Sequence, residues 1–499
     1  MYEYFYDYYK ANNMGLILTG NFDPEEVKPI IEAKFGVLEG GDIPENKIAE
    51  PFKFDGRQVM NKRLTPIKVG LMGFRTVPAG HPDELVLDVA NSLLQNESGT
   101  GFVDQLQNDG KIMMAWSFAE NMDEAGNQYF IYVPKILIQS LKGAEKLMIE
   151  QVEKLKTGNY SDDLLLSIKN EMYKNHQLST DNQINRGYLF ANMFRRGKTY
   201  KDIADYPNRL KKVSKEDIKR VCEKYFGKDY FVLQSRTGFP KKEKLENPKF
   251  KPVQVDQIKE SEYAKAFKEI PENKLKDRFI DFNKDLTEID LKGNKLYVVK
   301  NPINDIYDLT IQYHYGEFSD PDLEILADLM SYAHPENQSL VEFKKEISLL
   351  GSNYYFESTS NSFQLHITGI EKNLDQIIKK LNAVVQNPYV DEKSFDILAK
   401  SIKTGRKAEK EEPMVIAQAL AQYGLFGDKS LVKNRSTAKE ISKMNYKDVL
   451  GKLQEVKKHR VSIHFTGLTK SEEIKELVES YYTLERNAPS LMPYKTPLV

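Results

Sequence analysis

Histidine, cysteine and carboxylate side chains are the groups in this sequence that could bind a metal or transfer a proton. A helical zinc site needs two histidines one turn apart on the same face, with a glutamate beside them that serves as base to the metal-bound water. The seven histidines are His81, His176, His314, His334, His366, His459 and His464. None of them has a second histidine at that spacing. The sequence therefore predicts that it forms no helical zinc site of this kind.

Two near-matches to reactive sites also fail. His81 and Glu84 form a His-x-x-Glu, but Leu85 follows, so we expect His81 to be a loop residue that precedes a helix. Cys222 is the single cysteine of the sequence, which excludes an internal disulfide and a cysteine-based zinc site. The sequence contains no Gly-x-Ser-x-Gly motif and no identifiable Cys-His arrangement. These motifs therefore give no indication of nucleophilic catalysis.

Charged residues do not indicate nucleic acid or an anionic membrane as a partner. Lys and Arg number 72 and Asp and Glu number 73, which leaves a formal net charge of −1. The basic stretch 195–198, Arg-Arg-Gly-Lys, lacks the Gly-rich loop that would cradle a phosphate. We expect it to lie on a solvated turn.

One pattern is repeated near both ends of the sequence and marks the elements that would position a site. Residues 13–36 read NMGLILTGNFDPEEVKPIIEAKFG and residues 460–482 read RVSIHFTGLTKSEEIKELVESYY, and their Thr-Gly pairs align without a gap. In each copy an apolar stretch precedes Thr-Gly, and an acidic segment with helical spacing of apolar residues follows it. We predict a strand, a turn and an amphipathic helix in both copies, with Asp23 and Ser471 as helix N-caps. Repetition of such a unit indicates duplicated domains.

The remaining sequence alternates strand-like and helical segments on either side of a charged linker. Residues 239–275 are rich in Lys, Glu and Pro and have no apolar period, which predicts a solvated linker. Strands are expected at 57–60, 67–74, 113–120, 127–133, 230–234, 295–300, 308–315, 352–359 and 362–368, and helices at 82–94, 103–108, 138–155, 161–177, 322–333, 340–350, 374–387 and 394–408. This order predicts an α+β fold in which mixed sheets are covered by helices.

Three segments in order carry a family resemblance: YYKANNMGLILTGNFDPEEVKPIIEAKFG, GTGFVDQLQNDG and ADYPNRLKKVSKEDIKRVCEKYFG. They resemble the pitrilysin or insulinase group of zinc metallopeptidases, peptidase family M16, and the resemblance extends over nearly the whole chain. It implies repeated αβ domains of the LuxS/metallohydrolase-like kind, usually four. In the family these form two bowl-shaped halves around a closed chamber that digests unfolded peptides.

Mapped onto the family, the chain holds parts of three repeats. Residues 1–38 resemble the end of a first repeat, and the aromatic start MYEYFYDYYKANN indicates that the chain begins inside a larger domain. Residues 57–245 resemble a complete second repeat, residues 246–275 a linker, and residues 276–490 a complete third repeat without a zinc motif. The family's zinc site, an inverted His-x-x-Glu-His with a distal glutamate, belongs to the first repeat.

The third repeat carries a degenerate form of the zinc motif. The resemblance places Glu324, Ala327 and Asp328 where the family has His, Glu and His. On the helix that would carry the distal glutamate stand Lys400, Lys403, Thr404 and Arg406. Since a zinc site needs about three good protein ligands, we expect no metal here and an acidic, solvated helix face instead.

The sequence-based hypothesis is a non-catalytic portion of an M16 zinc metallopeptidase that forms part of the chamber and binds extended peptide. Its peptide-binding residues are predicted on the strand at 352–359, with Ser352, Tyr354, Tyr355 and Phe356 as candidates. The alternative is an inactive M16-like subunit that is the binding or scaffold partner of a separate zinc-bearing chain. In either case the chain alone is expected to be inactive and without a cofactor, and zinc is implied for the full-length or partner protein.

The predicted partners are unfolded or extended peptides and a zinc-bearing M16 domain, in cis or in trans. No apolar run reaches the roughly 20 residues that cross a bilayer. The first residues also lack the basic start and apolar middle of a signal peptide. These features do not assign the protein to a cellular compartment.

Overall fold

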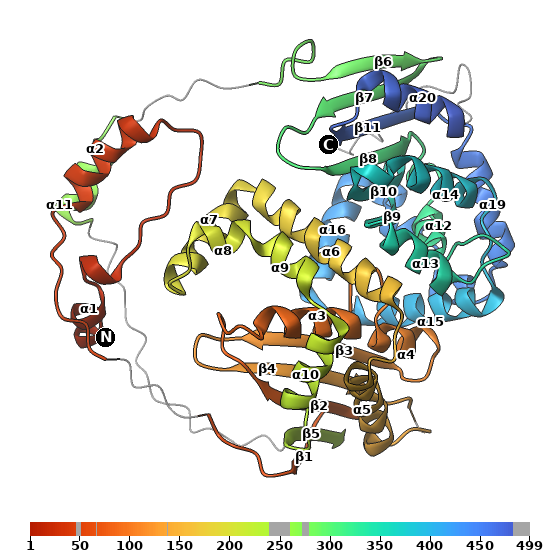
Figure 1. Cartoon of the computed structure of the whole chain (residues 1–499). Coiled ribbons are helices and arrows are strands. Elements are labelled where there is room, and N and C mark those ends of the chain that lie inside the picture. The colour runs from red at the N-terminus through yellow and green to blue at the C-terminus, as the bar shows by residue number, and fades with distance from the viewer. Residues whose placement is uncertain (46–50, 66, 137, 239–259, 272–278, 483–499) are drawn as a thin grey trace.

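The computed structural model of the chain contains two mixed β-sheets, each packed against its own set of helices (Figure 1). The structure describes residues 1–45, 51–65, 67–136, 138–238, 260–271 and 279–482. The fold class predicted from the sequence, α+β with mixed sheets covered by helices, is confirmed. No helix within these described ranges is long and apolar enough to span a membrane.

The first sheet has five strands in the order β1-β5-β2-β4-β3, of which β1 and β5 are parallel and the other neighbours antiparallel. Its strands are β1 (Arg57–Thr65), β2 (Val69–Thr76), β3 (Met114–Asn121), β4 (Gly126–Val133) and β5 (Tyr230–Thr237). The helices of this unit are α3 (Glu84–Leu94), α4 (Phe102–Asn108), α5 (Leu141–Thr157), α6 (Asp162–Asp181), α7 (Gln183–Arg195), α8 (Tyr200–Ala204), α9 (Tyr206–Lys212) and α10 (Lys215–Tyr225).

The second sheet has six strands in the order β6-β7-β11-β8-β10-β9, with β7 and β11 parallel and the other neighbours antiparallel. Its strands are β6 (Thr287–Leu291), β7 (Asn294–Lys300), β8 (Ile306–Tyr313), β9 (Ser352–Ser358), β10 (Phe363–Ile370) and β11 (Val461–Gly467). Its helices are α12 (Leu323–Met330), α13 (Leu340–Leu349), α14 (Leu374–Gln386), α15 (Glu392–Ala408), α16 (Pro413–Phe426), α17 (Leu431–Asn434), α18 (Ala438–Ile441), α19 (Tyr446–Val456) and α20 (Ser471–Tyr481).

The two sheets share one topology. The order β1-β5-β2-β4-β3 of the first matches β7-β11-β8-β10-β9 of the second, strand for strand and with the same directions. In both units the strand that closes the repeat, β5 or β11, lies between a parallel and an antiparallel neighbour. The helix before it also makes the same contact, because Lys224 and Lys452 pair with Asp83 and Asp322 at the start of α3 and α12, at 3.2 and 3.5 Å.

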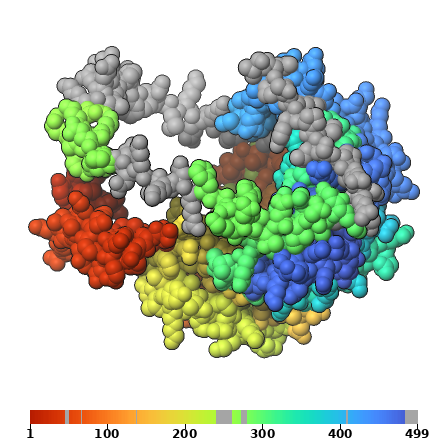
Figure 2. All heavy atoms as spheres, turned by 90° about the horizontal axis from the view of Figure 1, so that it is seen from above, coloured from red at the N-terminus to blue at the C-terminus, as the bar shows by residue number. Residues whose placement is uncertain are grey.

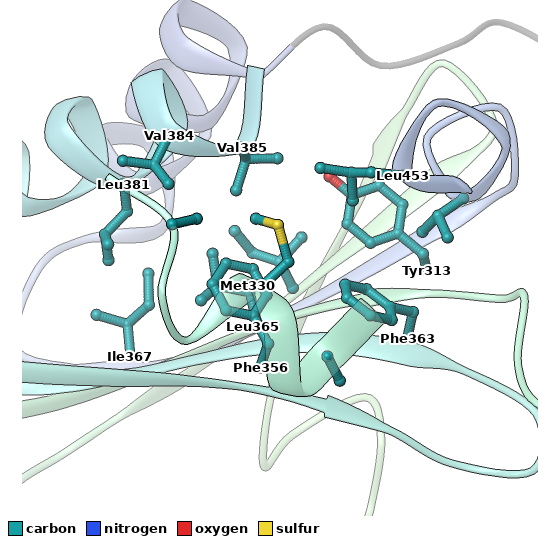
Figure 3. Close-up of a cluster of buried hydrophobic side chains, with 14 of the residues drawn as sticks. Tyr313, Met330, Phe356, Phe363, Leu365, Ile367, Leu381, Val384, Val385 and Leu453 are labelled. Carbon is teal, nitrogen blue, oxygen red and sulfur yellow. The ribbon is translucent and has the colours of Figure 1, made fainter. Parts of the chain in front are cut away.

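Each sheet buries one face under its helices and so forms a separate hydrophobic core. Alternating residues of β8 and β10, such as Leu309, Ile311, Leu365 and Ile367, point into the core of the second unit. Figure 3 shows side chains of strands and helices in this core, with Met330 of α12 among them. The apolar face of each amphipathic helix is thereby removed from water, which is the main stabilising contribution.

The N-terminal copy of the repeated pattern lacks the strand that we predicted. Helix α2 (Pro24–Phe35) forms with Asp23 as N-cap, as expected, but residues 14–20 pair with no strand within the described residues. Here Thr19 instead donates a hydrogen bond to the Gln183 carbonyl at the start of α7. Figure 2 shows this red N-terminal segment at the margin of the molecule beside the yellow helices. The prediction was wrong because a strand needs neighbours to satisfy its backbone, and the described sheets offer this segment none.

Other local predictions also need correction. Ser471 is the first residue of α20 rather than its cap, and it hydrogen-bonds the neighbouring Glu472 carboxylate. Within the predicted linker, α11 (Glu262–Lys268) is a helix capped by Ser261 that buries no residue, while most of the remaining linker lies outside the described residues. Helices α7 and α16 were not among the predicted helices, and neither of them buries a residue.

The two units meet along α6. Tyr173 donates a hydrogen bond to Asp305 at 2.8 Å, and Lys174 donates one to the Asn353 side chain at 2.8 Å. Asn170 donates to the Leu349 carbonyl at 2.9 Å, at the end of α13, against which α6 packs. These contacts place α6 beside the start of strand β9.

Candidate functional site

An ion-pair network lies on the helix face of the second unit where the resemblance placed a degenerate zinc motif, which we call the degenerate zinc position. Arg406 on α15 donates to Glu324 on α12 at 2.6 Å and to Glu409 at 3.1 Å. Arg435 also pairs with Glu409, so this carboxylate is held between two guanidinium groups. The Arg406 side chain is 11% exposed, which makes it the buried centre of the network.

The acidic helix face that we expected is exposed, since Asp328 is exposed and the Glu324 side chain is 46% exposed. The ion pair of Glu324 with Arg406, 82 residues away in sequence, was not expected. Ala327, which the resemblance placed at the position of the family's catalytic glutamate, is 5% exposed and carries no reactive group. Desolvation, together with repulsion from Glu324, raises the pKa of Asp328 above the usual range of an aspartate. Arg406 pairs with the carboxylates Glu324 and Glu409, and a guanidinium group cannot activate water.

Metal ligands do not gather elsewhere in the described part of the chain. Among those residues, no group of three His, Cys, Asp or Glu side chains has a geometry that could hold a metal ion. His81, for which the sequence suggested a loop, lies before α3, and its Nδ1 accepts a hydrogen bond from the Asp83 amide at 2.9 Å. Cys222 is buried on α10, which raises the pKa of its thiol to about 12.

A related charge cluster stands on α3 of the first unit. Glu84 pairs with Arg196 at 3.6 Å and with Lys198 at 3.4 Å, and Arg195 and Arg196 pair with Asp123. The basic stretch 195–198 includes a turn with Arg195 and Gly197 exposed, as expected, and its cations also belong to an ion-pair cluster, which was not expected. Sequence reasoning missed it because Glu84 and Asp123 lie more than 70 residues away from these cations.

Asp88 is the carboxylate of this cluster with the most perturbed acidity. Burial, with a further contribution from Glu84, raises its pKa to about 7. Its Oδ1 accepts a hydrogen bond from Asn121 at 3.4 Å, and nearby Arg196 and Lys198 oppose the shift. The group is therefore partly protonated near neutral pH.

The predicted peptide-binding strand lies at an edge of the second sheet. Strand β9 pairs with β10 on one side and with no strand on its other side within the described residues. The Thr359 amide donates to the Ser362 carbonyl at 2.8 Å, which fixes the alternation of bonded pairs along the two strands. The backbone groups of Tyr355 and Glu357 therefore face β10, whereas those of Tyr354, Phe356 and Ser358 face the free edge.

The four candidate side chains on β9 point to different sides. Tyr355 is 53% exposed and stacks on His366, with ring centroids 4.5 Å apart. Phe356 and Ser352 are buried, and the ring of Tyr354 packs against Phe343 on the core side. A bound peptide could therefore contact the Tyr355 side chain, but it would meet the other three positions through their backbone.

The counterpart strand β3 of the first unit has a blocked edge. The Ser117 amide donates to the side chain of Gln95 at 2.6 Å, so a residue at the end of α3 already uses this edge. No described side chain bonds the edge-facing backbone of β9 in the same way. Of the two equivalent edges, that of β9 is thus available for pairing.

A pocket of about 310 Å³ opens beside the start of β9. Its lining includes Ser352, Asn353 and Tyr355 of the strand, together with Lys344 of α13 and Glu97 of the first unit. Burial lowers the pKa of Lys344, and no carboxylate of the described residues forms an ion pair with it. The pocket therefore places the Lys344 amine, together with the Glu97 carboxylate, next to the free strand edge.

The faces of the two sheets that are turned away from the helices differ in chemistry. One row across the second sheet consists of Tyr297, His464, Thr310, His366 and Tyr355. The aligned row across the first sheet consists of Met60, Leu233, Leu71, Ile131 and Trp116. One sheet offers hydrogen-bonding rings, and the other offers a row of exposed or partly exposed apolar side chains. Period-two alternation could have revealed both rows from the sequence, but not their alignment.

Comparison with known proteins finds one family match. Residues 1–172 match the family model described as "Peptidase M16 inactive domain". No curated protein matches the sequence. The predicted resemblance to peptidase family M16 is confirmed by the family match.

Three solved structures are similar over part or nearly all of the chain. A mutant of the ferredoxin protease FusC in complex with Arabidopsis ferredoxin is 12% identical with a TM-score of 0.43, over 96% of this chain and 57% of that chain. A protease from Helicobacter pylori is 21% identical with a TM-score of 0.40, over 44% of this chain and 54% of that chain. The periplasmic protease PqqL from Escherichia coli is 12% identical with a TM-score of 0.39, over 99% of this chain and 59% of that chain. The chain spans somewhat more than half the length of each of these proteins.

Proposed function

Because the chain carries a peptidase M16 inactive domain over residues 1–172, we propose that it forms part of the peptide-digesting chamber of an M16 zinc metallopeptidase and binds extended peptide there. The chemistry of cleavage comes from a zinc-bearing M16 domain that this chain accompanies. The ion-pair network around Arg406 supports a non-catalytic role, since it fills the degenerate zinc position with a cation.

The free edge of β9 is the observation that carries the proposal. An extended peptide can add to such an edge through main-chain hydrogen bonds, which depend little on peptide sequence. Tyr354, Phe356 and Ser358 present their backbone groups there. The pocket with Lys344 lies next to the strand and can accept an acidic group of the peptide.

Proline substitution at Ser358 tests this mode of binding. Ser358→Pro removes an amide that faces the free edge and leaves the bonds between β9 and β10 in place. We expect the affinity for a labelled, unstructured peptide, measured by fluorescence anisotropy, to fall about tenfold, the effect of losing one or two such hydrogen bonds. Ser358→Ala, which keeps the amide and loses the same hydroxyl, is the matched control.

Equal peptide affinity of Ser358→Pro and Ser358→Ala would show that peptides do not pair with this edge. A proline at Tyr355 would be a poorer test, because the Tyr355 amide faces β10 and its loss would damage the sheet itself.

The exposed N-terminal unit favours a zinc-bearing partner domain, in cis or in trans. Helix α2 buries no residue, and Ile30 and Phe35 on its apolar face are 58% and 49% exposed. The corresponding helix α20 buries Ile474 and Val478 against its own unit. We propose that α2 and residues 14–20 complete a sheet and core that the zinc-bearing domain supplies.

This association can be tested with the zinc-bearing M16 polypeptide of the same source. Ile30→Asp places a charge in the proposed contact and should weaken co-sedimentation of the two polypeptides in analytical ultracentrifugation. Glu32→Asp on the same helix keeps the charge and should not. Equal association of both variants would contradict a contact through α2.

A further inference from the structure

Helix α16 lies at a groove that shares no residue with the strand edge of β9 and that borders the ion-pair network around Arg406. The groove has a volume of about 820 Å³ and is formed by α15, α16, α17 and α18. Its floor includes Val415, Ile416, Leu420 and Tyr423 of α16, all at least 38% exposed. Successive members of this set are one, four and three residues apart, so their side chains lie on one side of the helix. They form a stripe about 12 Å long that covers two helical turns.

Cationic side chains border this apolar stripe. They are Lys403, Arg406, Lys410, Lys433, Arg435 and Lys439. They come from α15 and the turn after it, and from α17 and α18, which are the elements that form the groove with α16. Glu409 is the single carboxylate of the lining, and Arg406 and Arg435 already pair with it.

Three of these cations have no counter-charge. Lys433 pairs with Asp428, but no carboxylate of the described residues forms an ion pair with Lys403, Lys410 or Lys439. All three side chains are exposed. An apolar floor between unpaired positive charges is complementary to a segment that carries apolar side chains flanked by negative ones.

We propose that this groove docks an amphipathic helical segment of a partner polypeptide, whose apolar face lies on the α16 stripe and whose acidic side chains pair with Lys403, Lys410 and Lys439. A helix fits because the stripe is straight and two turns long, which matches side chains of the partner at helical spacing. The site is separate from β9, so a chain that binds peptide at the strand edge can engage this partner at the same time.

Binding of synthetic peptides to the full chain tests the proposal. The probe is a fluorescein-labelled helical peptide built of alternating Leu-Leu and Glu-Glu pairs, and its matched probe has Lys in place of every Glu. We expect the acidic peptide to bind, its affinity to fall as salt rises, and the basic peptide not to bind. Equal binding of both peptides would overturn the proposal.

Substitutions in the groove assign the binding to this site. Lys403→Glu together with Lys439→Glu should weaken binding of the acidic peptide about tenfold or more, since two attractive charges become repulsive. Lys393→Glu together with Lys400→Glu makes the same charge change on α15 outside the groove and should have a smaller effect. Leu420→Asp should also weaken binding, whereas Leu425→Asp, on the same helix outside the groove, should not.

Two results would overturn the inference. One is equal affinity of the groove variants and their controls, since the peptide would then bind elsewhere. The other is a chain that binds dodecanoate but not the acidic peptide, with dodecanoate binding lost in the same groove variants. The groove would then be a site for a small amphipathic anion. All substituted side chains are exposed, and circular dichroism verifies that each variant is folded.

Discussion

A single arginine determines the electrostatics of the α12 face. Arg406 lies between Glu324 and Glu409 and forms ion pairs with both carboxylates. An arginine needs carboxylate partners but no exact coordination geometry, so it stabilises the fold without creating a reactive centre. Residues on two helices that are distant in sequence thus form a structural ion-pair network.

Removal of this guanidinium should destabilise the second unit. Arg406→Met leaves Glu324 and Glu409 without their shared cation, and we expect the free energy of unfolding to fall by about 1–2 kcal/mol, because both carboxylates are partly buried. Urea unfolding measures the change. Lys400→Met, on the exposed surface of the same helix, should change it by less than about 0.5 kcal/mol. An unchanged midpoint in Arg406→Met would show that the network contributes nothing to stability.

Asp88 should make stability depend on pH. Its pKa of about 7 in the folded chain exceeds the ordinary value of 3.8, so the folded state binds the proton more tightly than the unfolded state does. This contribution is full below about pH 4 and is lost as pH rises through about 7. Asp88→Asn removes the titration, and its stability relative to the wild type should rise by about 4 kcal/mol between pH 4 and pH 8.

Urea unfolding at a series of pH values measures this difference. Asp396→Asn on the exposed face of α15 is the control and should parallel the wild type. Parallel pH profiles of Asp88→Asn and the wild type would mean that Asp88 is ionised throughout this range.

At the level of elements, the two copies of the repeated strand-turn-helix pattern differ in structure because they have different neighbours. Strand β11 lies between β7 and β8, and α20 packs against α14, whereas residues 14–20 and α2 have no such partners within the described residues. The same helix-forming sequence is therefore a core element in one place and an exposed helix in the other. Pattern alone does not distinguish the two, since burial depends on which sheet lies beside the helix.

Matched substitutions in the two copies should show this difference. Ile474 is 1% exposed, and Ile474→Ala should lower the free energy of unfolding by about 3 kcal/mol through the cavity it leaves. Val27 occupies the equivalent position of α2. Val27→Ala should lower the free energy of unfolding by less than about 0.5 kcal/mol, because α2 buries no residue. Thermal or urea unfolding of both variants decides this, and a large cost for Val27→Ala would show that α2 packs against the folded units.

At the scale of the whole molecule, the two units share one topology and differ in what their edges and faces offer. Gln95 closes the edge of β3, and β9 stays open. Contacts of α6 with Asp305 and Asn353 place the first unit next to the start of that open edge. The two units are thus similar frameworks, and of the two equivalent edges that of β9 alone is open within the described residues.

The purified chain should neither retain zinc nor cleave peptides. The helix face that could coordinate a metal carries Glu324, Ala327 and Asp328 and is occupied by Arg406. Elemental analysis after dialysis, with a quenched unstructured peptide assayed with and without added zinc, measures both properties. Stoichiometric zinc with chelator-sensitive cleavage would mean that a metal site is assembled from residues other than these.

The sequence by itself determined the local elements and the chemistry that is excluded. Asp23 was predicted as the N-cap of a helix, and the structure confirms it, because capping acts over two or three residues. The repeat of 13–36 and 460–482 indicated duplicated units, and two sheets of one topology are present. Histidine spacing excluded a helical zinc site, since that motif lies within one helical turn and is fully visible in sequence.

Only the tertiary structure decided which distant groups meet and which elements are covered. The ion pairs of Arg406 with Glu324 and of Arg196 with Glu84 join residues that are far apart in sequence, and no local signal encodes such contacts. Neighbours contributed by other segments decide whether residues 14–20 pair as a strand. They also decide that the edge of β9 is open and that a basic groove forms at α16. Strand pairing and burial are properties of these long-range contacts, so a local pattern predicts an element but not its partners.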